Sequence, residues 1–263
     1  EKIKLGGKDT EILDYAKALY ERINESIKEA KEEAYGTSSE AMEHTVFCIK
    51  ETDVPVKDLV GGRKKELAAF LEQDEHPEKL SDGETYDVMR YWYSYYGDDL
   101  TVVGWDRALI IEPSGKYEDI LFLIETANMQ LVELMTYDGY LDRVLDKAYD
   151  DIENVFSRRG LWYSARAMMR ELSEVRIDLT EITEELANIT KFFGDWYLAK
   201  IYMSCSRKFH IDDWHKTVKD KLDTLNKLYT MANDENDSRR MFILELLIVL
   251  MFVIDIIVLL FTL

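Results

Sequence analysis

Two acidic residues lie inside the most apolar stretch of the chain, and they raise the clearest chemical question. The terminal segment from Met241 to Leu263 is apolar except for Glu245, Asp255 and Thr262. A helix of that length reaches about 34 Å, against about 30 Å of bilayer hydrocarbon. A carboxyl group near the bilayer centre costs about 2.5 to 3.5 kcal/mol on insertion scales and is seldom kept without a use. The sequence therefore predicts a membrane-spanning helix with functional acids.

The spacing of the two acids places them on the same side of that helix. Ten residues at about 100° each put Asp255 about 80° from Glu245, and supercoiling narrows this angle further. We expect copies of the span, or a partner span, to associate through this face, with Asp255 hydrogen-bonded across the interface or lining a hydrated path. The alternative is that Asp255 is tolerated near the end of a plain anchor.

Two arginines, Arg239 and Arg240, immediately precede the span, and no basic residue follows it. Short segments flanking a span carry more Lys and Arg on the cytoplasmic side, so this asymmetry predicts that the large N-terminal part stays on that side. The predicted arrangement is a tail-anchored, single-pass protein. Its predicted membrane and oligomer interface consists of Glu245, Asp255, Arg239 and Arg240.

A second candidate is the pair of histidines in the stretch HIDDWH, His210 and His215. Metal ligands must converge on one point, and residues five apart at a helix start do not face the same way. Asp212 or Asp213 is better explained as the cap of a helix that begins near Trp214. We therefore predict no metal site here.

The stretch RYWYSYY, residues 90–96, is the densest aromatic cluster of the chain. Aromatic side chains stack on bases or ligands, but a single-strand binder also needs interleaved basic residues, and only Arg90 supplies one. Packing in a core and against a hairpin is the preferred interpretation. A ligand site stays open as the alternative.

The main concentration of basic residues outside the span edge consists of four arginines, Arg158, Arg159, Arg166 and Arg170. They suit a solvated helical hairpin better than a lipid or RNA contact. The net charge of −19 also argues against nucleic-acid binding. Nucleophile-elbow, phosphate-loop, dinucleotide and metalloprotease motifs are absent from the sequence, so we predict no enzymatic activity and no cofactor.

The elements that must position these residues fall into three predicted parts. Turn residues and short runs of β-formers predict a small N-terminal α+β domain, residues 1–115. Periodicity of three and four then predicts a long antiparallel helical bundle over residues 116–236, followed by a transmembrane helix, residues 239–263. The fold class is α+β and predominantly α. The expected N-terminal elements are helices over 10–35, 63–73 and 81–96, a strand over 45–50, and a hairpin of strands 99–103 and 108–112.

Three apolar seams define the predicted bundle. The first runs through Ile120, Ile124, Ala127, Leu131, Leu134, Tyr137, Leu141, Val144, Ala148, Ile152 and Val155. The second covers residues 161–193 and ends at Gly194, and the third covers residues 213–232. A polar stretch, residues 233–238, is expected to separate the third helix from the span.

The C-terminal third resembles the family named for "required for meiotic nuclear division". The similarity lies over residues 170–260, in the stretch KLDTLN at 221–226, the polar stretch at 233–238, and the pair Leu244–Glu245 followed by Asp255. The upstream stretches VRIDL at 175–179 and FFGDW at 192–196 are also similar to family segments. Leu246, Asp255 and the absence of proline before Phe192 depart from the family pattern. The resemblance implies a single-pass, oligomeric membrane protein without enzymatic activity.

Three functional hypotheses follow from these observations. The leading one is a non-enzymatic scaffold that binds the lipid bilayer, copies of itself and protein partners, but no nucleic acid. The second is an oligomeric channel or transport component with an acid-bearing span. The third is a membrane-tethered enzyme or ligand sensor that uses the aromatic N-terminal domain.

Overall fold

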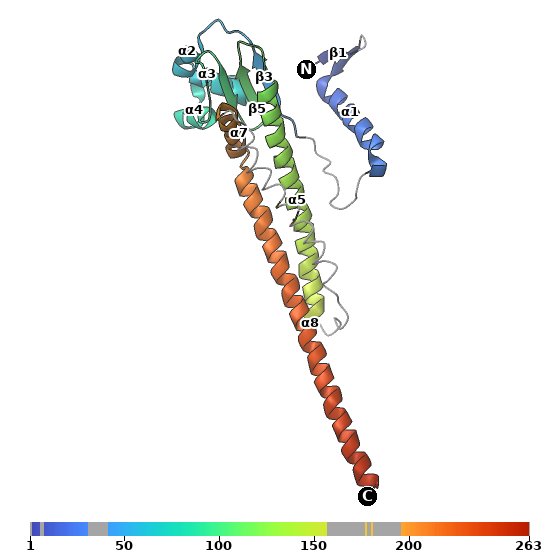
Figure 1. Cartoon of the computed structure of the whole chain (residues 1–263). Helices are drawn as coiled ribbons and strands as arrows, with labels where there is room; N and C mark the ends of the chain where they lie inside the picture. The colour runs from blue at the N-terminus through green and yellow to red at the C-terminus, as the bar shows by residue number, and fades with distance from the viewer. Residues whose placement is uncertain are drawn as a thin grey trace. The chain divides into compact units, whose positions relative to one another are not determined.

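The computed structural model describes residues 2–5, 8–30, 42–156, 177, 180 and 196–262 (Figure 1). Within this range the chain is mostly helical, with a small mixed sheet and an apolar C-terminal helix, as the sequence predicts. It divides into two compact units, Glu1–Thr37 and Ser38–Leu263. Apart from Ile177 and Thr180, the predicted second helix of the bundle lies outside the described residues, as do the four arginines at 158–170.

The first unit consists of a hairpin followed by one helix. Strands β1 (Lys2–Leu5) and β2 (Lys8–Glu11) pair antiparallel, and α1 (Ile12–Ser26) follows directly, with a short 3₁₀ turn over Lys28–Ala30. The predicted helix over 10–35 is therefore too long: α1 starts two residues later than predicted, because Thr10 and Glu11 belong to β2, and it ends at Ser26. Residues 31–41 lie outside the described range. The hairpin itself was not predicted, since its strands are rich in charged residues.

The second unit is built on a three-stranded sheet in the order β3-β5-β4. Strand β4 (Leu100–Val103) pairs antiparallel with β5 (Arg107–Ile111), which confirms the predicted hairpin. At its turn, a Cβ on Gly104 would lie 2.9 Å from the Arg107 carbonyl oxygen, so glycine allows this close approach. Strand β3 (Thr45–Ile49) pairs parallel with β5, which places β5 at the centre.

Three short helices cover one face of the sheet. These are α2 (Val56–Gly62), α3 (Lys64–Glu72) and α4 (Asp82–Met89), and a 3₁₀ turn (Pro77–Lys79) lies between the last two. The core between them consists of apolar side chains from all three helices and from β4 and β5: Val56, Val60, Ala68, Leu71, Val88, Met89, Leu100, Val102, Leu109 and Ile111. Helix α4 ends at Met89, so the predicted helix over 81–96 is wrong beyond that point.

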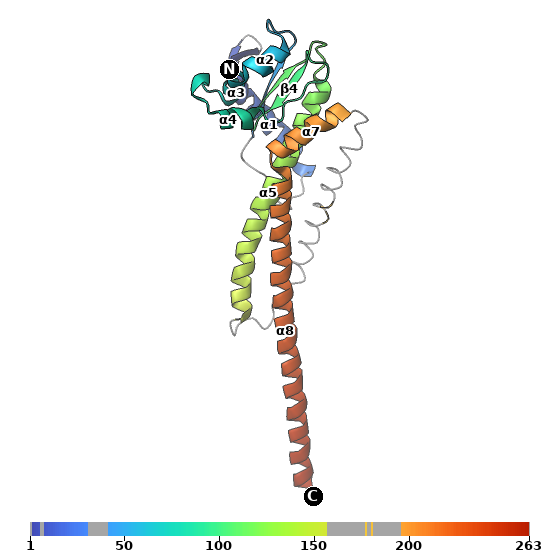
Figure 2. The ribbon, with the colours of Figure 1, turned by 90° about the vertical axis from the view of Figure 1, so that its left-hand side faces the viewer.

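The opposite face of the sheet is covered by helix α7 (Trp196–Lys208), which packs against β4. Figure 2 shows the sheet between α2–α4 on one side and α7 on the other. Because side chains alternate along a strand, Thr101, Val103, Ala108 and Ile110 point away from the first core, and all four are buried. We call the sheet, helices α2–α4 and helix α7 the head. The head is a three-layer arrangement with β4 and β5 buried on both faces.

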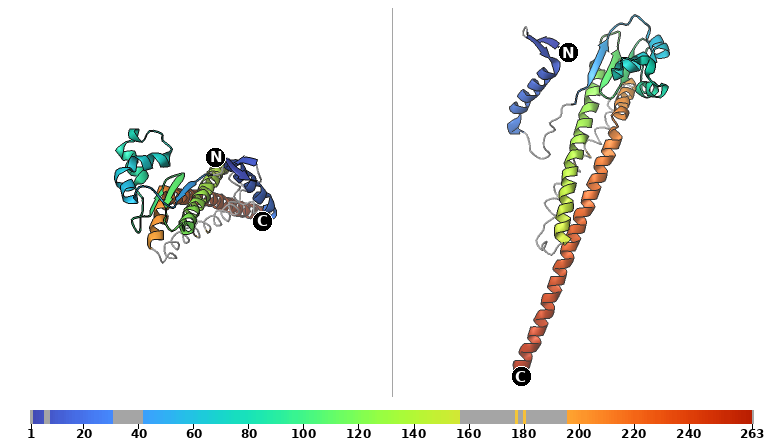
Figure 3. Two further views of the ribbon diagram at one scale, coloured as in Figure 1. Left: turned by 90° about the horizontal axis from the view of Figure 1, so that it is seen from above. Right: turned by 180° about the vertical axis from the view of Figure 1, so that it is seen from behind.

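Two long helices leave the head together and form what we call the stalk. Helix α5 (Glu118–Phe156) and helix α8 (Ile211–Thr262) pack along each other and run in the same direction (Figures 1 and 3). The predicted first seam is buried from Ile120 through Ala148, and from the third seam Val218, Leu222, Leu225 and Tyr229 are buried. The two seams are confirmed over these residues, and the side chains of Ile152 and Val155 lie outside the description. The antiparallel neighbour expected between them stays a prediction.

Helix α8 is uninterrupted through residues 233–238, so the predicted polar break is wrong. Relative to alanine, these six residues cost a helix about 3 to 4 kcal/mol in intrinsic propensity. Interrupting the helix would cost more, because nucleating a second helix alone costs about 4 kcal/mol and the two new ends leave backbone groups unpaired. The Arg240 guanidinium also lies 3.9 Å from the Asp237 carboxylate, one turn away.

Candidate functional site

The first part of the site is the junction at which α7 turns into α8. His210 adopts a left-handed backbone (φ 52°), and the side chains on either side of it, Phe209 and Ile211, are fully buried. The His210 Nδ1 atom lies 3.1 Å from the Asp213 carboxylate in the first turn of α8. Helix α8 begins at Ile211, three residues before Trp214, so Asp212 and Asp213 lie within its first turn, and the prediction that one of them caps the helix is wrong. In the part of the chain that the structure describes, no group of three or more His, Cys, Asp or Glu side chains could hold a metal ion.

A buried carboxylate, Asp99, joins the head to α7. Its Oδ1 accepts from the backbone amides of Tyr95 (2.8 Å) and Tyr96 (2.6 Å), and its Oδ2 accepts from the Tyr197 hydroxyl (2.9 Å). Burial alone would raise the pKa of Asp99, but these hydrogen bonds outweigh it and lower the pKa below the ordinary value. Burial also raises the pKa of Tyr197. The ionised carboxylate thus fixes the turn before β4 to helix α7.

The aromatic cluster at 90–96 lies on this turn and is only partly used for packing. Tyr93 pairs with Thr101 beside the hairpin, as expected. Trp92, Tyr95 and Tyr96 are exposed, so the packing prediction is wrong for these three residues. The guanidinium groups of Arg90 and Arg207 lie over the Tyr91 ring, at 5.3 and 5.6 Å from its centroid.

A buried hydrogen bond joins α7 to α5. The Tyr202 hydroxyl donates to the Gln130 side-chain oxygen at 2.6 Å, and both residues are buried. Together with Asp99 and Tyr197, this bond anchors α7 between the sheet and the stalk. Because α7 leads directly into α8, the orientation of α8 is set by the head.

A charged contact holds α5 and α8 in register below the head. The Lys221 ammonium lies 2.6 Å from a carboxylate oxygen of Asp138 and 2.6 Å from one of Asp142. Lys221 and Asp138 are 20% and 18% exposed, whereas Asp142 is 59% exposed. Burial alone would lower the pKa of Lys221, but the two carboxylates outweigh it and raise the pKa.

The apolar end of α8 carries all four of the predicted interface residues. The window Arg240–Val258 is long and apolar enough to cross a membrane, and none of it is buried. Arg239 and Arg240 lie in α8 at the start of this window, and Glu245 and Asp255 are exposed within it. The structure thus places the four residues on one continuous helix. Their role as an interface stays a prediction.

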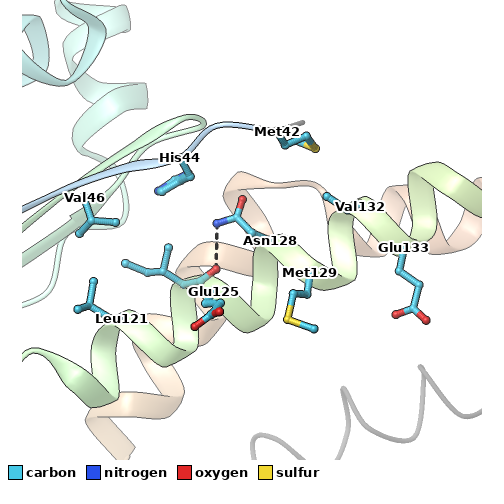
Figure 4. A pocket seen from close by; sticks show the side chains of 10 residues that line it. Met42, His44, Val46, Leu121, Glu125, Asn128, Met129, Val132 and Glu133 are labelled. Carbon is cyan, nitrogen blue, oxygen red and sulfur yellow. Dashed lines mark hydrogen bonds between the residues drawn. The ribbon is translucent and has the colours of Figure 1, made fainter. Parts of the chain in front are cut away.

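A pocket of about 700 Å³ lies between the segment leading into β3 and helix α5 (Figure 4). Its upper wall consists of Met42, His44 and Val46, which alternate along the extended segment. Its lower wall is a face of α5 with residues three or four apart, Leu121, Ile124, Glu125, Asn128 and Val132 among them. Sequence reasoning missed this site, because no motif connects residues 42–46 with residues 121–133.

The comparisons with known proteins identify relatives without an assigned activity. Residues 4–118 match a family model described as "Uncharacterized protein MJ0711, N-terminal domain", and this match ends at the first residue of α5. The chain is 20% identical over 252 residues to "Uncharacterized protein MJ0711" of Methanocaldococcus jannaschii, which covers 95% of this chain and 75% of that protein. No solved structure matches the chain. The resemblance to the "required for meiotic nuclear division" family stays a prediction.

Proposed function

We propose that this chain is a non-enzymatic, membrane-anchored scaffold in which a cytoplasmic head is rigidly joined to an oligomeric single-pass span. The observation that carries the proposal is the continuity of α8 from Ile211 to Thr262. A simple anchor needs only a flexible linker before its apolar segment. A continuous helix instead transmits the orientation of the head to the span.

Contacts in the head and in the adjoining part of the stalk support this mechanical coupling. Tyr202 and Asp99 hold α7 to the rest of the head, and Lys221 holds α8 against α5. From Lys221 to Arg240 the helix rises about 28 Å, so the head stands well away from the membrane edge. The chain's net charge of −19 agrees with a head that does not adhere to anionic lipid.

Assembly is proposed to occur through the acidic face of the span. An exposed carboxyl in lipid is costly, and pairing it across a helix interface removes part of that cost. Replacing Asp255 with Leu should therefore weaken assembly while membrane insertion is unchanged or improved. The matched control is Val253→Leu, two residues away, which changes an apolar side chain only slightly.

The experiment is mass determination of the full chain in detergent by light scattering, combined with carbonate extraction from membranes. We expect an oligomer for the parent and the Val253→Leu variant, a smaller species for Asp255→Leu, and resistance to carbonate for all three. A strictly monomeric parent chain would contradict the oligomeric scaffold. Release of the parent into the carbonate wash would contradict the anchor.

A second candidate function is an oligomeric channel or transport component, favoured by the position of Glu245 and Asp255 on the same side of the span. In that case the rigid stalk would link the head to a pore. Ion flux into liposomes separates the two functions. Flux that depends on Asp255 favours the channel, and sealed liposomes with an intact oligomer favour the scaffold.

A further inference from the structure

The pocket between the segment leading into β3 and helix α5 has the size and walls of a small-molecule site. A volume of about 700 Å³ lies within the range of ligand pockets. Strand β3 is an edge strand, and α7 covers the sheet on the side of β4. Because α7 does not reach the β3 edge, a space remains between residues 42–46 and the side chains of Leu121 and Ile124 on α5. Buried Ile124 belongs to the wall, while exposed Met42, Glu125 and Met129 stand at its rim.

His44 lines this mainly apolar space through the carbon atoms of its ring. Both ring nitrogens are buried, and neither makes a hydrogen bond of ordinary geometry within the described structure. The ring packs edge-on against Phe209, with centroids 5.6 Å apart, which fixes its position. Burial lowers the pKa of His44, although the Trp105 backbone and Asp106 oppose the shift.

The other polar groups of the pocket are acceptors. The Asn128 amide nitrogen donates to the Ile124 carbonyl at 2.9 Å, and its oxygen points toward the extended segment (Figure 4). The Glu125 carboxylate stands at the exposed rim. Acceptors thus outnumber donors, and a carboxylate disfavours an anion close by. A matching ligand carries an apolar body and a hydrogen-bond donor.

From this geometry we infer that the pocket binds a small, mainly apolar molecule bearing an alcohol or amine group and rejects carboxylates of the same shape. The donor of the ligand meets the Asn128 side-chain oxygen, and its body lies between Val46, Leu121 and Val132. This site is independent of the membrane coupling proposed above. It adds a small-molecule binding site to the head.

The test uses three water-soluble probes that differ only in the head group: tryptamine, tryptophol and indole-3-acetate. The full chain in detergent is labelled with ¹³C at the methionine methyl groups. Met42 and Met129 report on the pocket, Met89 reports on the buried head core, and Met251 reports on the span. We expect tryptophol and tryptamine to shift the Met42 and Met129 signals saturably, and indole-3-acetate to bind at least tenfold more weakly.

Two tryptophan variants test whether the shifts come from the pocket. Val132→Trp fills the wall and should abolish binding, whereas Met135→Trp changes an exposed residue on the same helix outside the lining and should leave binding intact. His44→Phe keeps the aromatic contact with Phe209 and changes only the buried ring nitrogens, so it should leave tryptophol binding intact. The inference is overturned if the probes shift only Met251, if the carboxylate binds as well as the alcohol, or if Val132→Trp binds like Met135→Trp.

Discussion

The Lys221→Met variant removes the charge that holds α5 and α8 together while keeping most of the apolar stem of the side chain. In the parent, the ammonium lies 2.6 Å from carboxylate oxygens of both Asp138 and Asp142. After the substitution, Asp138 stays largely buried, at 18% exposed, without its cation. The stalk should therefore lose stability.

The magnitude follows from the burial of the three groups. Breaking a fully buried ion pair costs about 3 to 5 kcal/mol, and breaking an exposed pair costs less than about 1 kcal/mol. Here one carboxylate is mostly buried, while Asp142 is 59% exposed and well screened by solvent. We expect a loss of about 2 kcal/mol, which corresponds to a fall in Tm of about 4 to 8 °C for a chain of this size.

The assay is thermal melting followed by far-ultraviolet circular dichroism in non-ionic detergent, with Lys227→Met as the matched control on an exposed site of α8. The raised pKa of Lys221 means that its contribution is complete below the unfolded-state pKa of about 10.4 and is lost as pH rises through the folded-state pKa. The two variants should therefore differ at pH 7 and converge at high pH. Equal melting of both variants at pH 7 would refute the reasoning.

Three further substitutions test the head and the stalk. Asp99→Asn should lower the free energy of unfolding by about 1 to 3 kcal/mol. Because the pKa of Asp99 is lowered in the folded state, the parent's extra stability should be present above about pH 3.9 and vanish as pH falls below it. Acid titration of the melting temperature measures this loss. Tyr202→Phe leaves the buried Gln130 oxygen unpaired and should lower the free energy of unfolding in urea by about 1 to 3 kcal/mol. Leu131→Asp places a carboxylate at a fully buried position and should abolish the cooperative melt, whereas a parent-like melt would contradict the assignment of the seam.

The features that the sequence predicted well are those set by local periodicity and turn chemistry. The α5 seam repeats every three or four residues, and each predicted member from Ile120 to Ala148 is buried. The β4–β5 hairpin was predictable because apolar runs flank turn residues, including Gly104. Such signals lie within one short window of sequence.

The features that it missed depend on contacts between distant segments or on cooperativity. The parallel pairing of β3 with β5 joins residues about 60 positions apart, and the pocket at His44 needs α5 beneath it. Asn233 and its polar neighbours have low helix propensity, which favours a break. Continuing the helix through them nevertheless costs less free energy than ending it and nucleating a second one. In the first hairpin, β1 (KIKL) alternates over four residues only, and β2 (KDTE) contains no apolar residue.

The central claim is that one continuous helix joins the head to the span, and a distance across the polar segment tests it most directly. Spin labels would be placed at Lys227→Cys and Leu247→Cys in a chain whose exposed Cys48 is replaced by serine, and measured in lipid nanodiscs by pulsed electron paramagnetic resonance. Twenty residues of helix predict a single narrow distribution of backbone distances near about 30 Å. A broad distribution, or one centred well below that value, would show that the helix is interrupted and would contradict rigid coupling.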